Sequence, residues 1–408
     1  MNLFHRRKKT GKEHGQTLPL FAALVPIIIL FVGFAIDLGF AYVTKASLSK
    51  AVDSACLMGM RNLSQGQGQA ANIARSTFAM NYGASGRDSG PPVVNVAFST
   101  DANNNTLLTV NATATINTFF IRILPRWKTM DVAANSQATR AKLVMSLVLD
   151  RSGSMRSNGG AQALPPAVNT FIDLFDDAID RVSMISFASN VTVNVPIQYN
   201  FKTPIKNAAN AMVFAGGTFS QGGLAAGQAQ NNSVVVAPGE NVVKVAVFFT
   251  DGLANVIQNS LNCSGRATLR NFGGSDTGTV VGFFDPVSGN QLCSTSGGTP
   301  SCCAGVSQFQ SAIDGTFKSF LRANVTPDAD FRSIQTANAM RAQGMVVYSI
   351  GLGNSINKVF LQQVANDPAS PTFDPNLPQG EAVFAPTAAD LQDVFQTIAA
   401  KILLRLTQ

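Results

Sequence analysis

Residues 142–155 read KLVMSLVLDRSGSM, and this stretch decides the fold of the larger part of the chain. Residues 143–149 are apolar except for one serine, a composition typical of a strand buried on both faces of a parallel sheet. The strand ends at Asp150, where a short polar loop begins. A second apolar run at 245–250 ends before Asp251, so the sequence predicts two buried strands that each deliver a carboxylate at the carboxyl end.

Side chains that carry oxygen follow the first strand at alternate positions. Asp150, Ser152 and Ser154 can converge on one point, and neither His nor Cys is among them. Hard oxygen donors of this kind suit Mg²⁺, with Mn²⁺ or Ca²⁺ as the alternatives, rather than zinc. Turns of Asp, Ser and Gly also follow strands where no metal binds, so the spacing alone leaves a metal site and an ordinary turn both open.

Two later features favour the metal site. In a doubly wound sheet of strand order 3-2-1-4-5-6, the binding crevice opens between the first and fourth strands, where the order reverses. The strand before Asp251 is the fourth when counting starts at residue 143, so Asp150 and Asp251 are expected to flank one crevice. Between these strands, Thr218 adds a hydroxyl in a Gly-Gly-Thr loop.

The motif D-x-S-x-S at 150–154, followed by Thr218 and Asp251, resembles the metal-ion-dependent adhesion site of von Willebrand factor type A domains. The resemblance covers residue 143 to about 406 and implies an α/β fold with a doubly wound, mostly parallel sheet of the Rossmann type. It implies that Ser152, Ser154 and, in one conformation, Thr218 contact the metal directly. Asp150 and Asp251 would act mainly through bound water, and one position would remain for a partner's carboxylate.

Further elements complete this predicted domain. Two strands are expected at 181–187 and 191–197, and the second suits an antiparallel edge of the sheet. A last buried strand is expected at 345–350. Helices are predicted at 167–178, 221–230, 333–343 and 387–406.

The start of the chain predicts a membrane anchor. Residues 1–16 carry five basic residues and one acidic residue, a local charge of +4 out of the chain's +7, and residues 17–35 carry no charge. This length suits one bilayer crossing, and the charge bias places the N-terminus in the cytoplasm and the rest outside. A cleaved signal peptide is the alternative, but the apolar run is longer than an ordinary signal-peptide core. The basic charge therefore indicates topology and not nucleic-acid binding.

A second resemblance concerns the region from Gly15 to Asn62. Gly15, the motif IDLG at 36–39 and the motif AVDSA at 51–55 resemble the N-terminal region of TadE/TadG-like proteins of tight-adherence (Flp) pilus assembly. Helical spacing of small and apolar residues continues to Asn62, so the anchor is expected to project outward as one long helix.

The resemblance implies a single-pass protein of the bacterial inner membrane whose bulk lies in the periplasm. Members that prepilin peptidase processes carry Glu five residues after the cleavage-site glycine, where this chain has Leu20, so the anchor is expected to persist. Asp37 lies near the outer end of the anchor. We expect it to be solvated at the interface, and a functional role inside the membrane is the alternative.

A small helix-plus-sheet stalk is predicted between the anchor and the main domain. Strands are expected at 93–98 and 107–116, joined as a hairpin, and a third near 131–139. We expect Trp127, the single tryptophan, to pack on the hairpin, with a partner contact as the alternative. The predicted boundaries are a cytoplasmic tail at 1–16, the helical anchor at 17–62, the stalk at 63–140 and the von Willebrand factor A domain at 141–408.

A Gly/Ser/Thr/Asn-rich insertion is predicted at about 254–329, as a long loop over the crevice where it could set partner choice. Four cysteines in an exported domain indicate two disulfides of undetermined pairing, and a Cys₄ zinc site is the rival. The fifth, Cys56, is expected to be a small buried residue, with an intermolecular disulfide as the alternative. The four cysteines of the insertion are Cys263, Cys293, Cys302 and Cys303.

The residue types favour a binding module over an enzyme. The two histidines, His5 and His14, both precede the apolar segment, so no Ser-His-Asp or Cys-His arrangement can form in the outer part. Our first hypothesis is a membrane-anchored adhesion or assembly factor of the pilus that binds an acidic group of a pilus component, envelope component or surface ligand through Mg²⁺. The second is a structural subunit resembling a minor pilin, in which metal serves only stability, and a metal-dependent hydrolase is a distant third.

Overall fold

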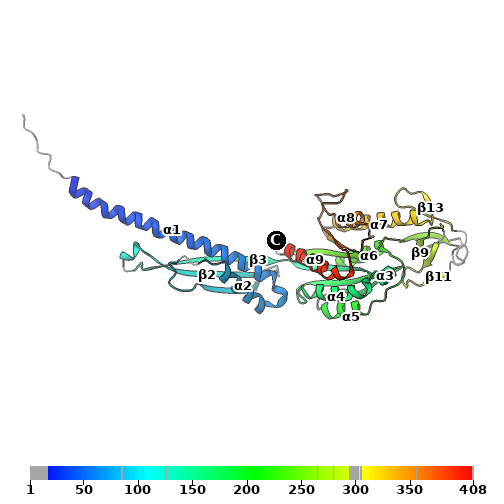
Figure 1. Cartoon of the computed structure of the whole chain (residues 1–408), viewed down its shortest axis with the longest axis horizontal. Helices are drawn as coiled ribbons and strands as arrows, with labels where there is room; N and C mark the ends of the chain where they lie inside the picture. The colour runs from blue at the N-terminus through cyan, green and yellow to red at the C-terminus, as the bar shows by residue number, and fades with distance from the viewer. Residues whose placement is uncertain are drawn as a thin grey trace, which may run out of the picture. The chain divides into compact units, whose positions relative to one another are not determined.

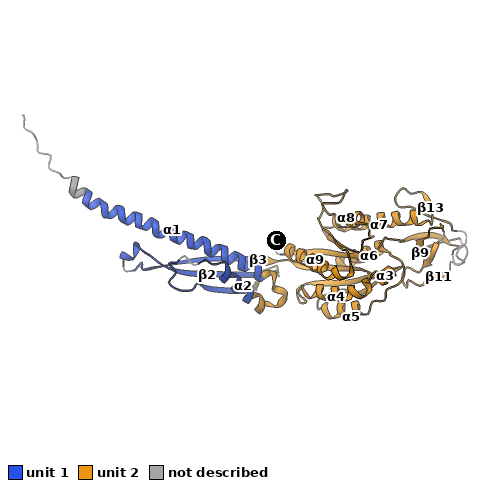
Figure 2. Cartoon of the chain, in the orientation of Figure 1, with its two compact units in different colours: residues 1–59, 71–98, 108–138 blue, residues 60–70, 99–107, 139–408 orange. Residues whose placement is uncertain are grey.

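The computed structural model describes residues 17–406, apart from 84–85, 104, 125, 264, 279, 294–302, 304–305 and 355, and without the side chains of residues 17–20 and 293. The predicted basic tail therefore lies outside the described residues. The chain forms two compact units, which Figure 2 colours separately. The first contains residues up to 59, 71–98 and 108–138, and the second contains 60–70, 99–107 and 139–408.

The first unit packs a long helix on a small sheet (Figure 1). Helix α1 runs unbroken over Thr17–Arg61, as the helical spacing predicts, and the sheet has the order β1-β2-β3. Burial alternates along β2, so one face of the sheet is covered. Cys56 lies in this covered layer and its Sγ donates to the Leu108 carbonyl at 3.2 Å, which confirms the prediction of a buried cysteine. The elements up to the end of β3 are α1, η1 (Leu63–Gln65, in the part of the chain that belongs to the second unit), α2 (Gln67–Asn81), β1 (Val93–Thr100), β2 (Thr106–Asn117), η2 (Ile121–Ile123) and β3 (Thr129–Arg140).

The N-terminal part of α1 is a candidate membrane span. Its mean hydropathy reaches 2.6, and its large apolar side chains from Phe21 to Leu38 are exposed. A helix with apolar residues on every side and no protein to cover them suits a bilayer. Length and composition alone allow a membrane anchor or a signal sequence.

The second unit contains a six-stranded sheet of order β15-β14-β7-β4-β5-β6. Every neighbouring pair is parallel except β5 and β6, which are antiparallel, so the predicted antiparallel edge is confirmed. The order reverses between β4 and β7, the first and fourth strands of the sheet, as predicted. The strands are β4 (Lys142–Asp150), β5 (Arg181–Phe187), β6 (Val191–Gln198), β7 (Val242–Thr250), β14 (Val346–Leu352) and β15 (Ala382–Ala385).

Helices cover both faces of this sheet (Figure 1). Alternate residues of β4 enter two separate cores: Leu147 and Leu149 face α4, α5 and α9, whereas Val148 faces α6, α7 and α8. A strand buried on both faces requires apolar residues at consecutive positions, which explains the composition of β4. The helices are α3 (Ser154–Ser157), α4 (Gly160–Asp173), α5 (Lys202–Asn210), α6 (Ser220–Asn232), α7 (Arg322–Ala342), α8 (Lys358–Ala365), η4 (Ala388–Asp390) and α9 (Leu391–Leu406).

The insertion after β7 is folded, and the prediction of a long loop is wrong. It forms a sheet of order β11-β10-β9-β8 and the pair β12-β13, around an apolar core of its own. Its Phe residues, such as Phe272 and Phe283, fill this core, although its Gly and Ser content suggested a loop. Cys263 and Cys303 form a disulfide, while Cys302 and the side chain of Cys293 lie outside the described residues. The strands are β8 (Val256–Cys263), β9 (Arg266–Gly274), β10 (Val280–Phe284), β11 (Gln291–Cys293), β12 (Gln308–Gln310) and β13 (Phe317–Ser319).

Two helices begin earlier than predicted. Helix α4 begins at Gly160 and not at residue 167, and α7 begins at Arg322 and not at residue 333. Both contain proline near the start, Pro165 and Pro166 in α4 and Pro327 in α7. Proline removes one backbone hydrogen bond and so imitates a boundary in the sequence, but tertiary packing outweighs that loss here.

Candidate metal centre

The carboxyl ends of β4 and β7 bring two aspartates to one edge of the sheet. The two strands are parallel neighbours, and Leu149 lies opposite Phe249. Asp150 and Asp251 follow within two residues of that pair, and both are buried. The register of two strands nearly a hundred residues apart therefore builds the crevice that the strand order predicts.

The Asp150 carboxylate is held by its own loop and by β7. Its Oδ1 accepts a hydrogen bond from the Ser152 backbone N–H at 2.7 Å. Its Oδ2 accepts one from the Thr250 hydroxyl at 2.6 Å. These two bonds fix the orientation of the carboxylate.

The Asp251 carboxylate is the point where the other side chains meet. Its Oδ1 accepts from the Ser154 hydroxyl at 2.8 Å and from the Ser152 hydroxyl at 3.4 Å, and the two hydroxyl oxygens lie 3.0 Å apart. Its Oδ2 accepts from Asn158 Nδ2 at 2.6 Å. The structure thus brings together four of the five predicted residues, Asp150, Ser152, Ser154 and Asp251.

Thr218 lies on the neighbouring loop, where its backbone is bonded to Asn255. Its N–H donates to Asn255 Oδ1 at 2.8 Å, and its carbonyl accepts from the Asn255 N–H at 3.1 Å. The Gly153 N–H donates to the Gly216 carbonyl at 3.0 Å, which ties this loop to the serine loop. Gly216 has φ +91°, and a Cβ there would lie 2.8 Å from Ser189 Oγ, so the conformation of the Thr218 loop and its packing on Ser189 favour glycine at this position.

Burial and like charge dominate the electrostatics of the crevice. Desolvation, followed by repulsion from Asp251, raises the pKa of Asp150 to about 7. Desolvation also raises the pKa of Asp251. Arg151 lies in the same loop but its guanidinium donates to Asn190 Oδ1 at 2.6 Å. Two buried carboxylates side by side with hydroxyls as partners form a site of negative charge that a cation would stabilise.

The donor set fits a hard divalent cation. Among the described residues, no group of three or more His, Cys, Asp and Glu could hold a metal ion. Any ion here must therefore take the serine hydroxyls together with the carboxylates, and such oxygen donors suit Mg²⁺ better than zinc.

Three residues that position the site were not predicted from the sequence. Thr250 and Asn158 bond the two carboxylates, and Asn255 at the start of the insertion holds the Thr218 loop. Thr250 carries a usable signal, because it directly precedes the aspartate at a strand end. Asn158 and Asn255 carry none, because their partners lie far away in the sequence.

The fold and the residue pattern define a von Willebrand factor type A domain, and the model of that family matches residues 145–271. Residues 15–62 match the Flp pilus-assembly TadE/G-like family. The chain therefore carries a TadE/G-like N-terminal segment and a von Willebrand factor type A domain in one polypeptide. No curated protein matches the chain.

Solved structures with similar folds include three pilus proteins. The pilus adhesin SpaC from Lactobacillus rhamnosus GG is 18% identical, with a TM-score of 0.43, over 78% of this chain and 36% of SpaC. The vWF domain of the type V pili tip protein Mfa5 from Porphyromonas gingivalis is 13% identical, with a TM-score of 0.44, over 66% of this chain and 98% of that domain. The PilB minor pilin from Streptococcus sanguinis is 14% identical, with a TM-score of 0.41, over 77% of this chain and 79% of PilB. The chain thus spans about a third of the length of SpaC.

Proposed function

We propose that this chain is a membrane-anchored component of Flp pilus assembly and adhesion, and that its von Willebrand factor A domain binds an acidic group of a partner protein through Mg²⁺. The observation that carries the proposal is the cluster at the sheet edge, where two buried carboxylates and two serine hydroxyls converge and Ser154 Oγ lies 2.8 Å from Asp251 Oδ1. The pilus context is supported by the TadE/G-like match at 15–62.

Each residue of the cluster has a proposed part. Ser152 and Ser154 would hold the ion through their hydroxyls, and Thr218 would join them from its loop. Asp150 and Asp251 would supply the negative charge, largely through bound water. The ion, when bound, would supply an electrophilic position for a carboxylate of the partner, because neutral hydroxyls leave most of its charge unbalanced. Mn²⁺ and Ca²⁺ are alternative ions for the same donors.

We propose that the apolar segment of α1 anchors this domain outside the cytoplasm. The apolar segment of α1 is long enough to cross a bilayer once, and the basic residues precede it. In the proposed topology the N-terminus is cytoplasmic, the apolar part of α1 crosses the inner membrane, and the rest of the first unit and the second unit lie in the periplasm. An oxidising compartment accords with the Cys263–Cys303 disulfide.

The test is a Mg²⁺ titration of the full chain in lipid nanodiscs by calorimetry, after removal of bound metal with chelator. We expect saturable binding that Asp251→Ala abolishes. Asp330→Asn is the matched control, because Asp330 is a partly buried carboxylate outside the cluster that accepts a hydrogen bond from the side chain of Asn357. Circular dichroism would establish that each variant is folded.

Cells that produce these variants would separate the two hypotheses about the pilus. Loss of adhesion or of assembled pili with Asp251→Ala, and not with Asp330→Asn, is expected for a metal-dependent binding component. Mg²⁺ binding without any change in pili or adhesion would favour the structural subunit, in which the metal serves stability. No Mg²⁺ binding by the unaltered chain would overturn the metal-dependent function.

A further inference from the structure

The connection between β2 and β3 exposes large apolar side chains next to basic ones. We call this set the loop surface: Phe119, Ile123, Leu124 and Trp127 with Arg122, Arg126 and Lys128. The four apolar side chains are 61%, 75%, 50% and 50% exposed, in that order, and the three basic residues are exposed as well. Because Trp127 is half exposed, the prediction that it packs on the hairpin applies at most to the covered half of its side chain.

The loop surface is clamped to α1 by a buried aspartate. Asp37 Oδ1 accepts from the Phe119 N–H, and Oδ2 accepts from the Phe120 and Ile121 N–H groups, all at 2.9 Å. The Arg87 guanidinium lies 3.6 Å from the same carboxylate. Asp37 is therefore buried and fully bonded, and the prediction that water solvates it at the interface is wrong. The sequence could not reveal this partner, which lies more than eighty residues away.

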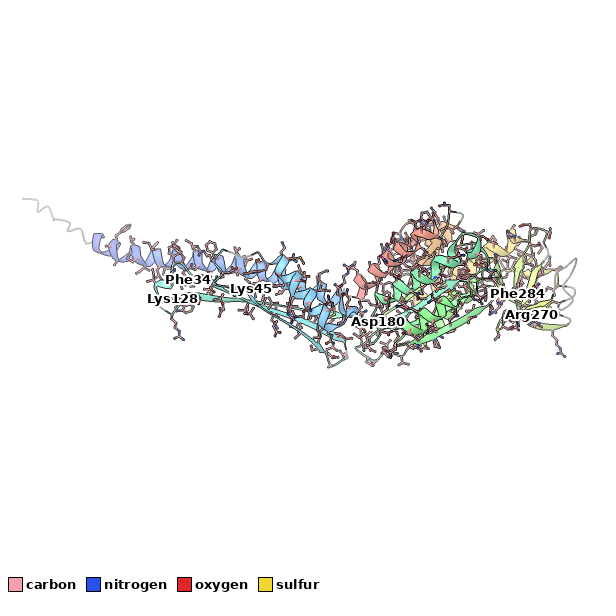
Figure 3. All side chains as sticks on the ribbon, turned by 60° about the horizontal axis from the view of Figure 1, so that its bottom comes forward. Phe34, Lys45, Lys128, Asp180, Arg270 and Phe284 are labelled. Atoms are coloured by element: carbon pink, nitrogen blue, oxygen red, sulfur yellow. A yellow bond between two sulfur atoms is a disulfide. The ribbon has the colours of Figure 1, made fainter. Side chains whose placement is uncertain are left out.

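The clamp places the loop at the outer end of the apolar part of α1. Phe120 packs directly on Gly33, where an added Cβ would lie 2.5 Å from the Phe120 Cβ. Gly33 precedes Asp37 by four residues, about 6 Å along the helix axis toward the membrane span. Figure 3 shows Lys128 at the same end of the sheet as Phe34 of α1, with Lys45 further along the helix. The loop surface thus lies beside the outer end of the exposed apolar part of the candidate span.

We infer that the loop surface lies in the interfacial region of the bilayer, as a second membrane contact that sets the depth and tilt of α1. This inference rests on the membrane anchor of the proposed function. It assigns a membrane contact to the loop surface, which has no part in the proposed metal binding. Aromatic rings are favoured at the level of lipid headgroups, and Arg and Lys beside them bind anionic headgroups. The partner chemistry is an anionic phospholipid surface.

The hydrogen bonds to Asp37 lower the entropic cost of placing the loop surface in the membrane interface. Three backbone donors on one carboxylate hold the loop backbone in place, so insertion of the apolar side chains costs little conformational entropy. The loop backbone is also bonded to itself, because the Thr118 N–H and hydroxyl donate to the Lys128 carbonyl. A flexible loop with the same composition would lose more freedom on entering the interface.

Trp127 is the single tryptophan of the chain, so its fluorescence reports on this surface alone. The full chain is placed in nanodiscs that contain phosphatidylglycerol and lipids brominated near the headgroup, and acrylamide is the aqueous quencher. We expect the brominated lipid to quench at least about half of the Trp127 emission, and acrylamide quenching to be about twofold weaker than in Asp37→Asn, as for a residue of the interfacial aromatic belt.

Charge reversal tests the headgroup contact. Arg122→Glu combined with Arg126→Glu and Lys128→Glu should reduce bromolipid quenching in discs rich in phosphatidylglycerol, and less so in discs of phosphatidylcholine. Lys50→Glu with Arg75→Glu is the matched control, since both are exposed basic residues of the same unit outside the loop surface, and it should leave quenching unchanged. If Asp37→Asn fails to fold, this charge-reversal set still decides the inference.

Two outcomes would overturn the inference. Trp127 emission that brominated lipid does not quench and acrylamide quenches freely would place the loop in water. Emission protected from both quenchers would mean that another copy of the chain covers it, which overturns a lipid occupant. A chain that does not enter nanodiscs at all would instead contradict the proposed anchor, so the two failures are distinguishable. Mg²⁺ binding should not respond to any of these variants.

Discussion

Asp180 and Asp150 lie near opposite ends of β4, and both are completely buried, but their surroundings differ in charge. At the amino end, Asp180 forms a bidentate pair with Arg140 at 2.7 and 2.8 Å and accepts from the Leu143 N–H at 3.0 Å. At the carboxyl end, Asp150 faces Asp251 and is bonded by a hydroxyl and a backbone N–H. The amino end carries a contacting ion pair, whereas at the carboxyl end Arg151 interacts with Asp150 only over a longer distance and donates its hydrogen bond to Asn190.

The difference separates a structural carboxylate from a candidate site. A buried charge that contacts its counter-charge inside the fold needs nothing further, whereas two buried carboxylates whose described hydrogen bonds all come from neutral donors favour a cation from solution. Asp37 in the first unit belongs to the structural kind, with three backbone donors and Arg87. The charges around a buried carboxylate therefore distinguish a structural carboxylate from one in a candidate site better than burial alone does.

The largest effect is expected at the amino end of the strand. Arg140→Met should lower the free energy of unfolding by about 3–5 kcal/mol, because it leaves Asp180 buried without its counter-charge. Urea unfolding of the full chain in detergent, followed by circular dichroism, measures this. Lys206→Met is the control, since it removes the exposed Lys206–Asp173 pair and should cost below about 1 kcal/mol. Equal losses in the two variants would contradict the assigned role of Asp180.

The next effect concerns the hydroxyls at the carboxyl end. Ser152→Ala combined with Ser154→Ala should weaken Mg²⁺ binding on the order of 100-fold or more, since both proposed direct ligands are lost while the charge is unchanged. Calorimetry on the full chain checks this. Ser186→Ala on β5 removes a buried hydroxyl that has no hydrogen-bond partner, so it should leave Mg²⁺ affinity unaltered. Retained affinity in the double variant would mean that carboxylates alone define the site.

Asp330 tests whether burial by itself makes an ionised carboxylate destabilise the folded state. Desolvation raises the pKa of Asp330 to about 7, from 3.8, and the Asn357 side chain donates a hydrogen bond to it at 3.3 Å. Because the folded-state pKa lies above the unfolded one, the stability that this group contributes is present near pH 4 and is lost as the pH rises to about 7. Asp330→Asn should therefore gain on the order of 2 kcal/mol at pH 8 and almost nothing at pH 4. The test is to measure the melting temperatures of both chains from pH 4 to pH 8. A difference between the two chains that does not change with pH would contradict the destabilisation of the ionised carboxylate by burial.

The smallest effect is expected from a residue that only orients a carboxylate. Asn158 donates to Asp251 Oδ2 at 2.6 Å, and its own Oδ1 accepts from the Gly160 N–H at 3.2 Å. Asn158→Ala should weaken Mg²⁺ binding up to about tenfold, as expected for a group outside the ligand set. The control is Asn169→Ala in α4, because the Asn169 side chain donates to Asn210 and not to an aspartate of the cluster. Unchanged affinity in Asn158→Ala would limit its part to packing.

Proline and glycine content explain why the predicted starts of α4 and α7 and the predicted loop in the insertion were wrong. The prolines at the starts of α4 and α7 imitate helix boundaries, and the insertion has the composition of a loop although it folds into strands. In both cases the deciding contribution is burial against residues distant in the sequence: Leu164 enters the core with α9, and Phe272 packs within the insertion's own core. A local window contains no information on such partners.

The sequence alone determined the parts whose signals are local. The apolar run of β4, the D-x-S-x-S spacing after it and the uncharged segment of α1 each occupy fewer than about twenty residues, so composition and spacing predict the sheet, the four clustered residues and the candidate span. Tertiary structure alone decided that Asp180 meets Arg140, that Asp37 clamps a loop more than eighty residues away, and that Asn158 orients Asp251. The electrostatic energy of a buried charge depends on which groups surround it in space, and only the folded chain specifies those neighbours.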